Sequence, residues 1–162
     1  MKPANEPVFV IVAGPNGAGK STLAKVQGIP VVDPDVEAAR TRSDVAGGRA
    51  TIERIHRMIG RKESFALETT LSGHNGFKAM RAAKAAGFRI LLFYVGIESA
   101  EDCIERTKRR VDLGGHDVPA ADVLRRFPRS LRNLPTAIEL ADRAILFDNT
   151  DPLDLSPRTS AD

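Results

Sequence analysis

A single stretch near the N-terminus constrains the fold of this chain more than any other. It reads Gly14-Pro15-Asn16-Gly17-Ala18-Gly19-Lys20-Ser21 and satisfies the pattern G-x-x-x-x-G-K-[ST] in full. Residues 8–12 before it are apolar and mostly β-branched, which is typical of a buried parallel strand, and residues 21–27 after it favour a helix that ends at Gly28. A strand, a glycine-rich loop and a helix in this order predict a phosphate-binding loop in an α/β fold.

The chemistry of this loop predicts its ligand. Glycines allow backbone N–H groups to converge on phosphate oxygens, and the following helix adds the positive end of its dipole. Lys20 can reach the terminal phosphate, the Ser21 hydroxyl can bind Mg²⁺, and Thr22 supplies a second hydroxyl. We therefore expect residues 14–22 to bind a polyphosphate nucleotide. The alternative is a chance match in a glycine-rich turn.

The length and composition of the chain limit what else it can contain. With 162 residues, 42% of them hydrophobic and 28% charged, it suits one globular domain over 1–162, with a loose end at 1–7 and a loose end or a short strand at 150–162. The second substrate must then bind within the same domain. The single cysteine, Cys103, excludes a disulfide framework, and no apolar run reaches the roughly 18 residues of a membrane span. The simplest expectation is a cytoplasmic protein without a membrane contact.

Positive charge is concentrated in one segment, although the formal net charge is only +3. Between residues 106 and 132, eight basic residues stand against three acidic ones. The glycine-rich turn at 114–119 divides this segment into two basic helices, which predicts a helical lid that closes over phosphate groups. The alternatives are a solvated helix face or a nucleic-acid patch.

Polar side chains follow the predicted strands at 29–32 and 64–70. Because the carboxyl ends of parallel strands share one edge of a sheet, these side chains should lie beside the phosphate-binding loop. Of Asp33 and Asp35, one can accept a proton from a substrate hydroxyl and the other can hold Mg²⁺ through water. Either can instead cap the helix that follows. The candidate contacts for a polar second substrate are Glu68, Thr69, Thr70 and, in the turn above them, His74.

Glycine and proline residues predict where the helices break. A short helix is expected at 36–43, and Gly47-Gly48 should separate it from the next one. In the second basic helix, Pro128 predicts a kink and Pro135 a new start. A buried stripe is predicted there from the helical spacing of Leu124, Phe127, Leu131 and Leu134.

Five predicted strands that alternate with helices favour a parallel α/β sheet, and two kinds of chemistry fit it. In a kinase, Mg²⁺, Lys20 and lid arginines stabilise the transferring phosphoryl group while a carboxylate receives the acceptor's proton. In an ATPase or a switch protein, a residue positions water and a partner detects the bound nucleotide. Acidic residues at two strand ends and the basic, interrupted helix pair favour the kinase.

Several segments together resemble the small zeta-toxin-like kinases of bacteria. The resemblance is carried by the loop 14–22, Asp33-Pro34-Asp35, Phe65-Ala66-Leu67-Glu68-Thr69-Thr70-Leu71-Ser72-Gly73, Arg110-Val111-Asp112-Leu113-Gly114-Gly115-His116-Asp117-Val118-Pro119 and the following Arg125-Arg126-Phe127. It extends from about residue 8 to residue 149. It implies a three-layer P-loop kinase fold, with a five-stranded parallel sheet of order 2-3-1-4-5, helices on both faces and a helical lid.

The resemblance also implies roles for individual residues. Zeta toxins phosphorylate a hydroxyl of UDP-N-acetylglucosamine with Mg²⁺ and ATP, or GTP in some cases, and are paired with an antitoxin. Carried over, Lys20 is the phosphate clamp, Ser21 the Mg²⁺ ligand, and Asp35 the base, with Asp33 as the alternative base. Glu68 and Thr70 hold the acceptor. The resemblance makes three arginines candidates for lid residues that contact the phosphates, namely Arg106, Arg110 and Arg126. It places Asn149 near the adenine.

Three functional hypotheses follow. The first is a Mg²⁺-dependent kinase for a hydroxyl of a small metabolite. The second, suggested by the arginine-rich segment, is a kinase for a nucleic-acid 5′-hydroxyl. The third is a nucleotide-dependent binding module held by an antitoxin-like partner, which would bind ATP without phosphorylating an acceptor.

Overall fold

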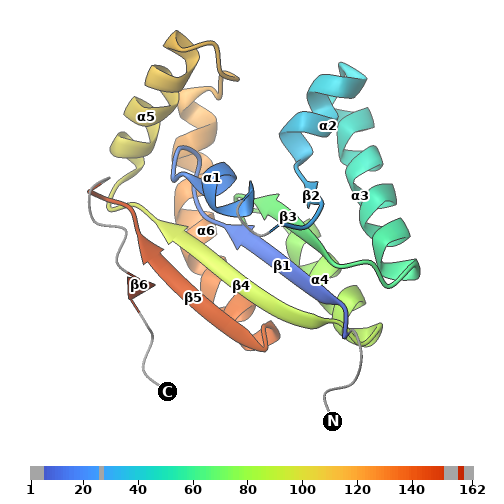
Figure 1. The fold of residues 1–162 in the computed structure, drawn as a ribbon. Helices are drawn as coiled ribbons and strands as arrows, with labels where there is room; N and C mark the ends of the chain where they lie inside the picture. The colour runs from blue at the N-terminus through green and yellow to red at the C-terminus, as the bar shows by residue number, and fades with distance from the viewer. Residues whose placement is uncertain (1–5, 26–27, 152–156, 159–162) are drawn as a thin grey trace.

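A computed structural model describes residues 6–25, 28–151 and 157–158. In chain order, the elements are β1 (Val8–Ala13), α1 (Lys20–Lys25), β2 (Val31–Val32), α2 (Pro34–Thr41), α3 (Asp44–Gly60), β3 (Phe65–Thr69), α4 (Asn75–Ala85), β4 (Arg89–Gly96), α5 (Ala100–Asp112), α6 (Ala120–Leu140), β5 (Arg143–Asp148) and β6 (Pro157–Arg158). Figure 1 shows their arrangement.

The strands form one sheet of order β2-β3-β1-β4-β5-β6. The first five are parallel, which confirms the predicted order 2-3-1-4-5. β6 pairs antiparallel with β5 and falls within 150–162, where the sequence predicts a short strand or a loose end, and the short strand is the alternative that the structure shows. β1 lies in the middle, between β3 and β4, and five of its six residues are buried. The loop that follows it therefore starts from the centre of the sheet.

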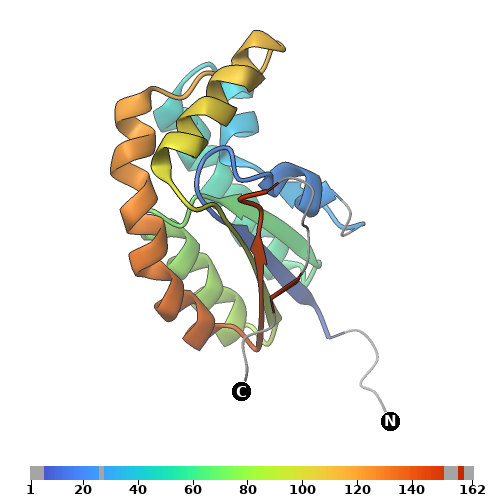
Figure 2. The ribbon, with the colours of Figure 1, turned by 90° about the vertical axis from the view of Figure 1, so that its left-hand side faces the viewer.

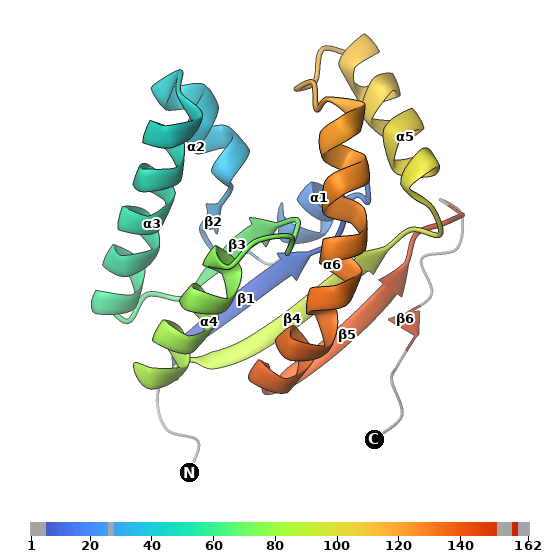
Figure 3. The ribbon, with the colours of Figure 1, turned by 180° about the vertical axis from the view of Figure 1, so that it is seen from behind.

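Helices cover both faces of the sheet, but unequally. Helices α3, α4 and α6 pack on one face around the largest apolar cluster, in which the rings of Phe9 and Phe65 stack with centroids 4.5 Å apart. On the opposite face, Ala24 of α1 packs on Val10 and Val12 of β1. Figures 2 and 3 show α1 on the other side of the sheet from α4 and α6. None of the helices in the described ranges is long and apolar enough to cross a membrane.

The expected break at Gly47-Gly48 is wrong, because α3 runs without interruption from Asp44 to Gly60. A Cβ atom at Gly47 would lie 2.4 Å from the Ala38 Cα, so the glycine is the close contact between α3 and α2. Glu37 of α2, only 5% exposed, adds ion pairs to Arg40 and to Arg54 of α3. These contacts hold α2 and α3 together beside the sheet.

Helix α6 also departs from the prediction. It continues through Pro128 and Pro135, so the expected new start at Pro135 is wrong. Leu124 and Leu131 are 49% and 45% exposed, and the buried positions are instead Val123, Ser130 and Ala137. The buried face contains a polar residue because the Ser130 hydroxyl lies 2.9 Å from the Tyr94 hydroxyl of β4. Phe127 and Leu134 of the predicted stripe are partly buried against the apolar clusters, so the stripe overlaps the buried face of the helix only in part.

Candidate active site

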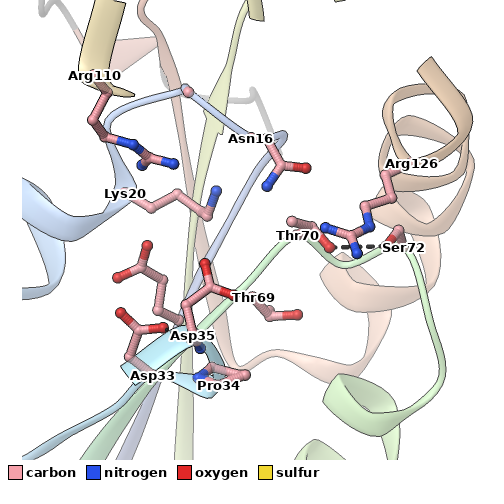
Figure 4. A pocket seen from close by; sticks show the side chains of 12 residues that line it. Asn16, Lys20, Asp33, Pro34, Asp35, Thr69, Thr70, Ser72, Arg110 and Arg126 are labelled. Carbon is pink, nitrogen blue, oxygen red and sulfur yellow. Dashed lines mark hydrogen bonds between the residues drawn. The ribbon is translucent and has the colours of Figure 1, made fainter. Parts of the chain in front are cut away.

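A cavity of about 250 Å³ lies at the carboxyl ends of β1, β2 and β3, beneath α5 and α6 (Figure 4). It gathers residues that are far apart in the sequence. The predicted site residues that line it are Asn16, Gly17, Lys20, Asp33, Asp35, Glu68, Thr69, Thr70, Arg110 and Arg126. Pro34 and Ser72 line it as well, although neither was predicted to contact a ligand.

The loop after β1 has the backbone that its glycines predict. Gly14, Gly17 and Gly19 have φ angles of 147°, 77° and 94°, in a region that residues with a Cβ rarely adopt. A Cβ at Gly14 would lie 2.2 Å from the Val95 carbonyl oxygen of β4. The loop can therefore pass this close to the sheet only because residue 14 is a glycine.

Asn149 supports this loop from the other side. Its Nδ2 donates a hydrogen bond to the Ala18 carbonyl oxygen at 2.9 Å, and a Cβ at Gly19 would lie 3.0 Å from the same nitrogen. The sequence predicts that Asn149 lies near the adenine. In the structure its amide holds the phosphate-binding loop in place, which sequence reasoning missed.

Lys20 is 7% exposed, and its Nζ donates to the Pro15 carbonyl oxygen of the same loop at 2.8 Å. Burial lowers the pKa of the Lys20 ammonium, although the nearby carboxylates of Glu68 and Asp35 oppose the shift. In Figure 4 the amine lies between Asn16 and the pair Asp33 and Asp35. A desolvated cation in this position has a strong attraction for phosphate oxygens.

Asn16 has a buried amide oxygen without a hydrogen-bond partner among the described residues. Leaving such an atom unpaired costs about 1–3 kcal/mol. Asn16 also lines the cavity, next to Lys20. Its side chain therefore borders the space that a ligand would fill.

Glu68 lies beside Ser21. The Ser21 Oγ donates to both carboxylate oxygens of Glu68, at 2.9 and 3.1 Å. Burial raises the pKa of Glu68, and the charge of Asp33 adds to the shift. The sequence predicts that Glu68 holds the acceptor, whereas its nearest described partner is the hydroxyl predicted to bind Mg²⁺. The role of Glu68 in acceptor binding therefore stays a prediction.

The two aspartates occupy different environments. Asp33 Oδ1 accepts a hydrogen bond from the Asp35 N–H at 2.9 Å, so Asp33 is the N-cap of α2, one of the alternatives left open by the sequence. Burial raises the pKa of Asp33, and its backbone hydrogen bond to Asp35 opposes the shift. Asp35 lies in the first turn of α2 with an exposed side chain that lines the cavity. Of the two, Asp35 is the more accessible to a substrate hydroxyl.

The oxygen donors around Ser21 suit a magnesium ion. Mg²⁺ prefers oxygen ligands and is usually held by one or two carboxylates together with substrate phosphates. The Ser21 hydroxyl and the Glu68 carboxylate provide such a set, with Asp33 close enough to raise the pKa of Glu68. Within the described ranges, no three or more His, Cys, Asp or Glu side chains form a metal site on their own. The residues therefore fit an ion that is bound jointly with a nucleotide.

The predicted lid arginines do not all meet at the cavity. Arg110 of α5 and Arg126 of α6 reach it from two sides (Figure 4). Arg106 instead donates from Nη2 to the Thr150 carbonyl oxygen at 2.8 Å, beyond the end of β5. Its Cβ approaches the loop at Gly17, where an added Cβ would lie 3.3 Å away. Arg106 is thus a neighbour of the loop on the side of Asn149.

The turn after β3 presents hydroxyl groups to the cavity. The Thr70 and Ser72 hydroxyl oxygens lie 2.8 Å apart, opposite Arg126 (Figure 4). The Leu71 N–H donates to Thr69 Oγ1 at 3.0 Å, and Asn133 of α6 donates to the Leu71 carbonyl oxygen at 2.8 Å. The sequence predicts a turn here, but nothing near the turn in the sequence indicates that Asn133, 62 positions from Leu71, holds it in place.

His74 lies outside the cavity lining. It is an exposed residue at the start of α4 and makes no side-chain capping hydrogen bond there. Its predicted contact with the substrate stays a prediction. Cys103, in contrast, is fully buried in an apolar cluster, and burial raises the pKa of its thiol to about 11.

Comparisons with known proteins agree with this architecture. No family model matches the chain. An uncharacterised protein of Haemophilus influenzae is 34% identical over 125 residues, which cover 72% of this chain and 89% of that protein.

Three solved structures are similar in fold. A proposed kinase from Chloroflexus aurantiacus has a TM-score of 0.69 at 15% identity, with 95% of this chain and 91% of that one covered. A chain of the PezAT chromosomal toxin–antitoxin system of Streptococcus pneumoniae has a TM-score of 0.70 at 16% identity, with 98% and 73% covered. A chain of the AvrRxo1-ORF1:-ORF2 crystal structure with ATP has a TM-score of 0.71 at 17% identity, with 90% of this chain and 55% of that one covered. The resemblance inferred from the sequence is thereby confirmed at the level of the fold.

Proposed function

Because the chain belongs to the same family as the Haemophilus influenzae protein and has the fold of P-loop kinases, we propose that it is an ATP- and Mg²⁺-dependent kinase for a hydroxyl group of a small molecule. One observation carries the proposal. A buried lysine, an accessible aspartate and two arginines from separate helices, Lys20, Asp35, Arg110 and Arg126, surround a single cavity at the phosphate-binding loop. Phosphoryl transfer is catalysed mainly by positioning and by positive charge around the reacting phosphate, together with a group that accepts or orients the nucleophile's proton, and these residue types can supply both.

Each group has a defined task in this reaction. The loop N–H groups and Lys20 bind the phosphates of ATP. Asp35 accepts the proton of the acceptor hydroxyl while the oxygen of that hydroxyl forms a bond to the γ-phosphorus. The bond between that phosphorus and the bridging oxygen breaks, which leaves ADP and a phosphate monoester. Arg110 and Arg126 neutralise the charge on the transferring group. Thr70 and Ser72 are positioned to hydrogen-bond the acceptor.

Mg²⁺ would be held by Ser21 and Glu68, with Asp33 as a further carboxylate nearby. When bound, the ion supplies positive charge to the nucleotide phosphates. The AvrRxo1 structure contains ATP, which supports ATP as the phosphate donor here. GTP belongs in the same assay, because the resemblance to zeta toxins implies it in some cases.

The test is phosphoryl transfer to a panel of hydroxyl compounds. The protein is mixed with Mg²⁺ and ATP or GTP, and with UDP-N-acetylglucosamine, a hydroxylated metabolite library or 5′-hydroxyl oligonucleotides, and products are followed by mass spectrometry. We expect a gain of one phosphate on a small molecule. Transfer to oligonucleotides alone would favour the nucleic-acid kinase. Tight ATP binding without any transfer would favour the binding module and, given the likeness to PezAT, a search for an antitoxin-like partner.

The role of Asp35 can be tested once an acceptor is found. Asp35→Asn should lower kcat by about 10²–10⁴-fold, the usual contribution of a general base, while the Kd for ATP is retained. Asp112→Asn, at the end of α5, is the matched control and should keep full activity. Undiminished turnover by Asp35→Asn would show that another group takes the proton.

A further inference from the structure

A second cavity, of about 340 Å³, lies beside the first, between α3, α4 and β3. Both helices pack on the same face of the sheet (Figure 3). Pro34 and Thr69 line the two cavities together, so the spaces share a wall at the end of β3. The volume is within the range of about 300–1,000 Å³ that is typical of small-molecule sites.

The walls of this second cavity differ from those of the first. Its lining is largely apolar and includes Ile55, Leu67 and Ala79, which are buried, and Ile52, which is exposed. Thr51 lines it as well, and its hydroxyl donates a 2.9 Å hydrogen bond to the Gly47 carbonyl oxygen. His56 and Lys78 are exposed and lie at its rim. The lining therefore suits a group that is mainly apolar, and the exposed His56 and Lys78 can contact polar substituents at the rim.

Gly48 borders the open space of this cavity. It lies inside α3, where a glycine costs about 1 kcal/mol relative to alanine. Packing explains the neighbouring Gly47, whose Cβ would collide with Ala38, but a Cβ at Gly48 would meet no atom within 4 Å. Gly48 lines the cavity, so its missing side chain leaves the cavity volume free.

We propose that this cavity binds the apolar, non-reacting part of the acceptor while the acceptor's hydroxyl reaches Asp35 past Pro34 and Thr69. The inference rests on the proposed kinase function. The acceptor is then an alcohol with a hydrocarbon or aromatic body. A sugar nucleotide placed here would bury hydroxyl or phosphate groups against Ile55 and Leu67 without hydrogen-bond partners, which is unfavourable.

The test uses primary alcohols of increasing apolar size, from ethylene glycol to 3-phenylpropanol. Binding is measured with Mg²⁺ and ADP present, from NMR shifts of the Gly48 and Ala79 amides, and phosphoryl transfer from ATP is measured in parallel. Each added methylene should improve affinity by about fourfold until the cavity is filled. Equal affinity across the series would overturn the proposal.

Two variants make the test specific. Gly48→Leu fills the cavity and should weaken 3-phenylpropanol binding at least tenfold, with unchanged affinity for ATP, and Gly48→Ala should have a smaller effect. Gly60→Leu is the matched control, because Gly60 ends the same helix, its Cβ would also meet no atom within 4 Å, and it does not line the cavity.

The two proposals fail in different ways. In one outcome, affinity rises with the size of the alcohol, Gly48→Leu abolishes this binding, and no alcohol is phosphorylated. This outcome would support the cavity assignment and count against the proposed kinase activity. Transfer to a polar acceptor with the same KM in wild type and Gly48→Leu would support the kinase and overturn the cavity assignment.

Discussion

Replacing Glu68 with glutamine tests the electrostatics of the site in a way that activity alone cannot. Glu68 is partly buried, and the charges of Asp33 and Asp35 repel its own. Burial and this repulsion both disfavour the charged carboxylate. Lys20 and the Ser21 hydroxyl favour it, but the pKa of Glu68 remains raised. Without a ligand, the charged carboxylate therefore destabilises the fold. Glutamine keeps an oxygen for Ser21 and removes the charge.

The expected result is a more stable protein that no longer responds to Mg²⁺. A gain of about 0.5–1 kcal/mol is reasonable for relief of strain at a functional site, and it corresponds to an increase of about 1–4 °C in Tm for a chain of this size. Wild type should gain about 2.7 kcal/mol from Mg²⁺–ATP at 100 times its Kd. Glu68→Gln should lose most of that gain, since it removes the carboxylate beside Ser21.

The stability difference between Glu68→Gln and wild type should depend on pH in a known direction. A carboxyl group with a raised pKa in the folded state binds more protons there than in the unfolded chain, so its contribution to stability falls as pH rises. The advantage of Glu68→Gln should therefore be largest at about pH 8 and shrink toward about pH 5, as Glu68 of the wild type becomes protonated. Differential scanning calorimetry without ligand measures this difference. Glu53→Gln, an exposed acid on α3, is the control. An identical Tm for wild type and Glu68→Gln at pH 8 would refute the reasoning.

Three further substitutions test the fold around the site. Gly14→Ala should abolish the thermal shift caused by Mg²⁺–ATP, because the new Cβ would lie 2.2 Å from a carbonyl oxygen of β4; calorimetry with and without the ligand shows this. Ser130→Ala should destabilise the protein by about 1–3 kcal/mol in urea unfolding, because it leaves the buried Tyr94 hydroxyl unpaired, and adding Tyr94→Phe should recover part of the loss. Glu37→Gln should lower the Tm at neutral pH but not in acid. Hydrogen bonds to arginine lower the pKa of Glu37, so the charged carboxylate stabilises the fold at neutral pH, and this stabilisation is lost as the pH falls and Glu37 becomes protonated.

Much of the fold could be predicted because its signals are local. The run at 8–12 is apolar on both faces and became the central strand β1, and the glycines that follow it adopt the φ angles that the loop pattern requires. Asp33, Asp35 and Glu68 could be placed at one cavity because parallel strands end at one edge. These inferences need only residue type, spacing and the geometry of a parallel sheet.

The rest depends on contacts between distant residues. Arg106 and Arg110 are four residues apart on one helix, yet one is bound to the Thr150 carbonyl oxygen and the other lines the cavity. On α6, Leu124 and Leu131 are exposed while Ser130 is buried and contacts the Tyr94 hydroxyl of β4. Such pairings are decided by how helices dock on the sheet, which spacing along one helix does not reveal.

The hydrogen bond from Asn149 to the loop also bears on how the protein is made. It joins residues 131 positions apart, and its donor directly follows the last parallel strand. On a ribosome, a nascent chain that ends before residue 149 lacks this support for the loop at Ala18. This contact with the phosphate-binding loop can therefore form only after residue 149 has been synthesised and β5 has paired with β4.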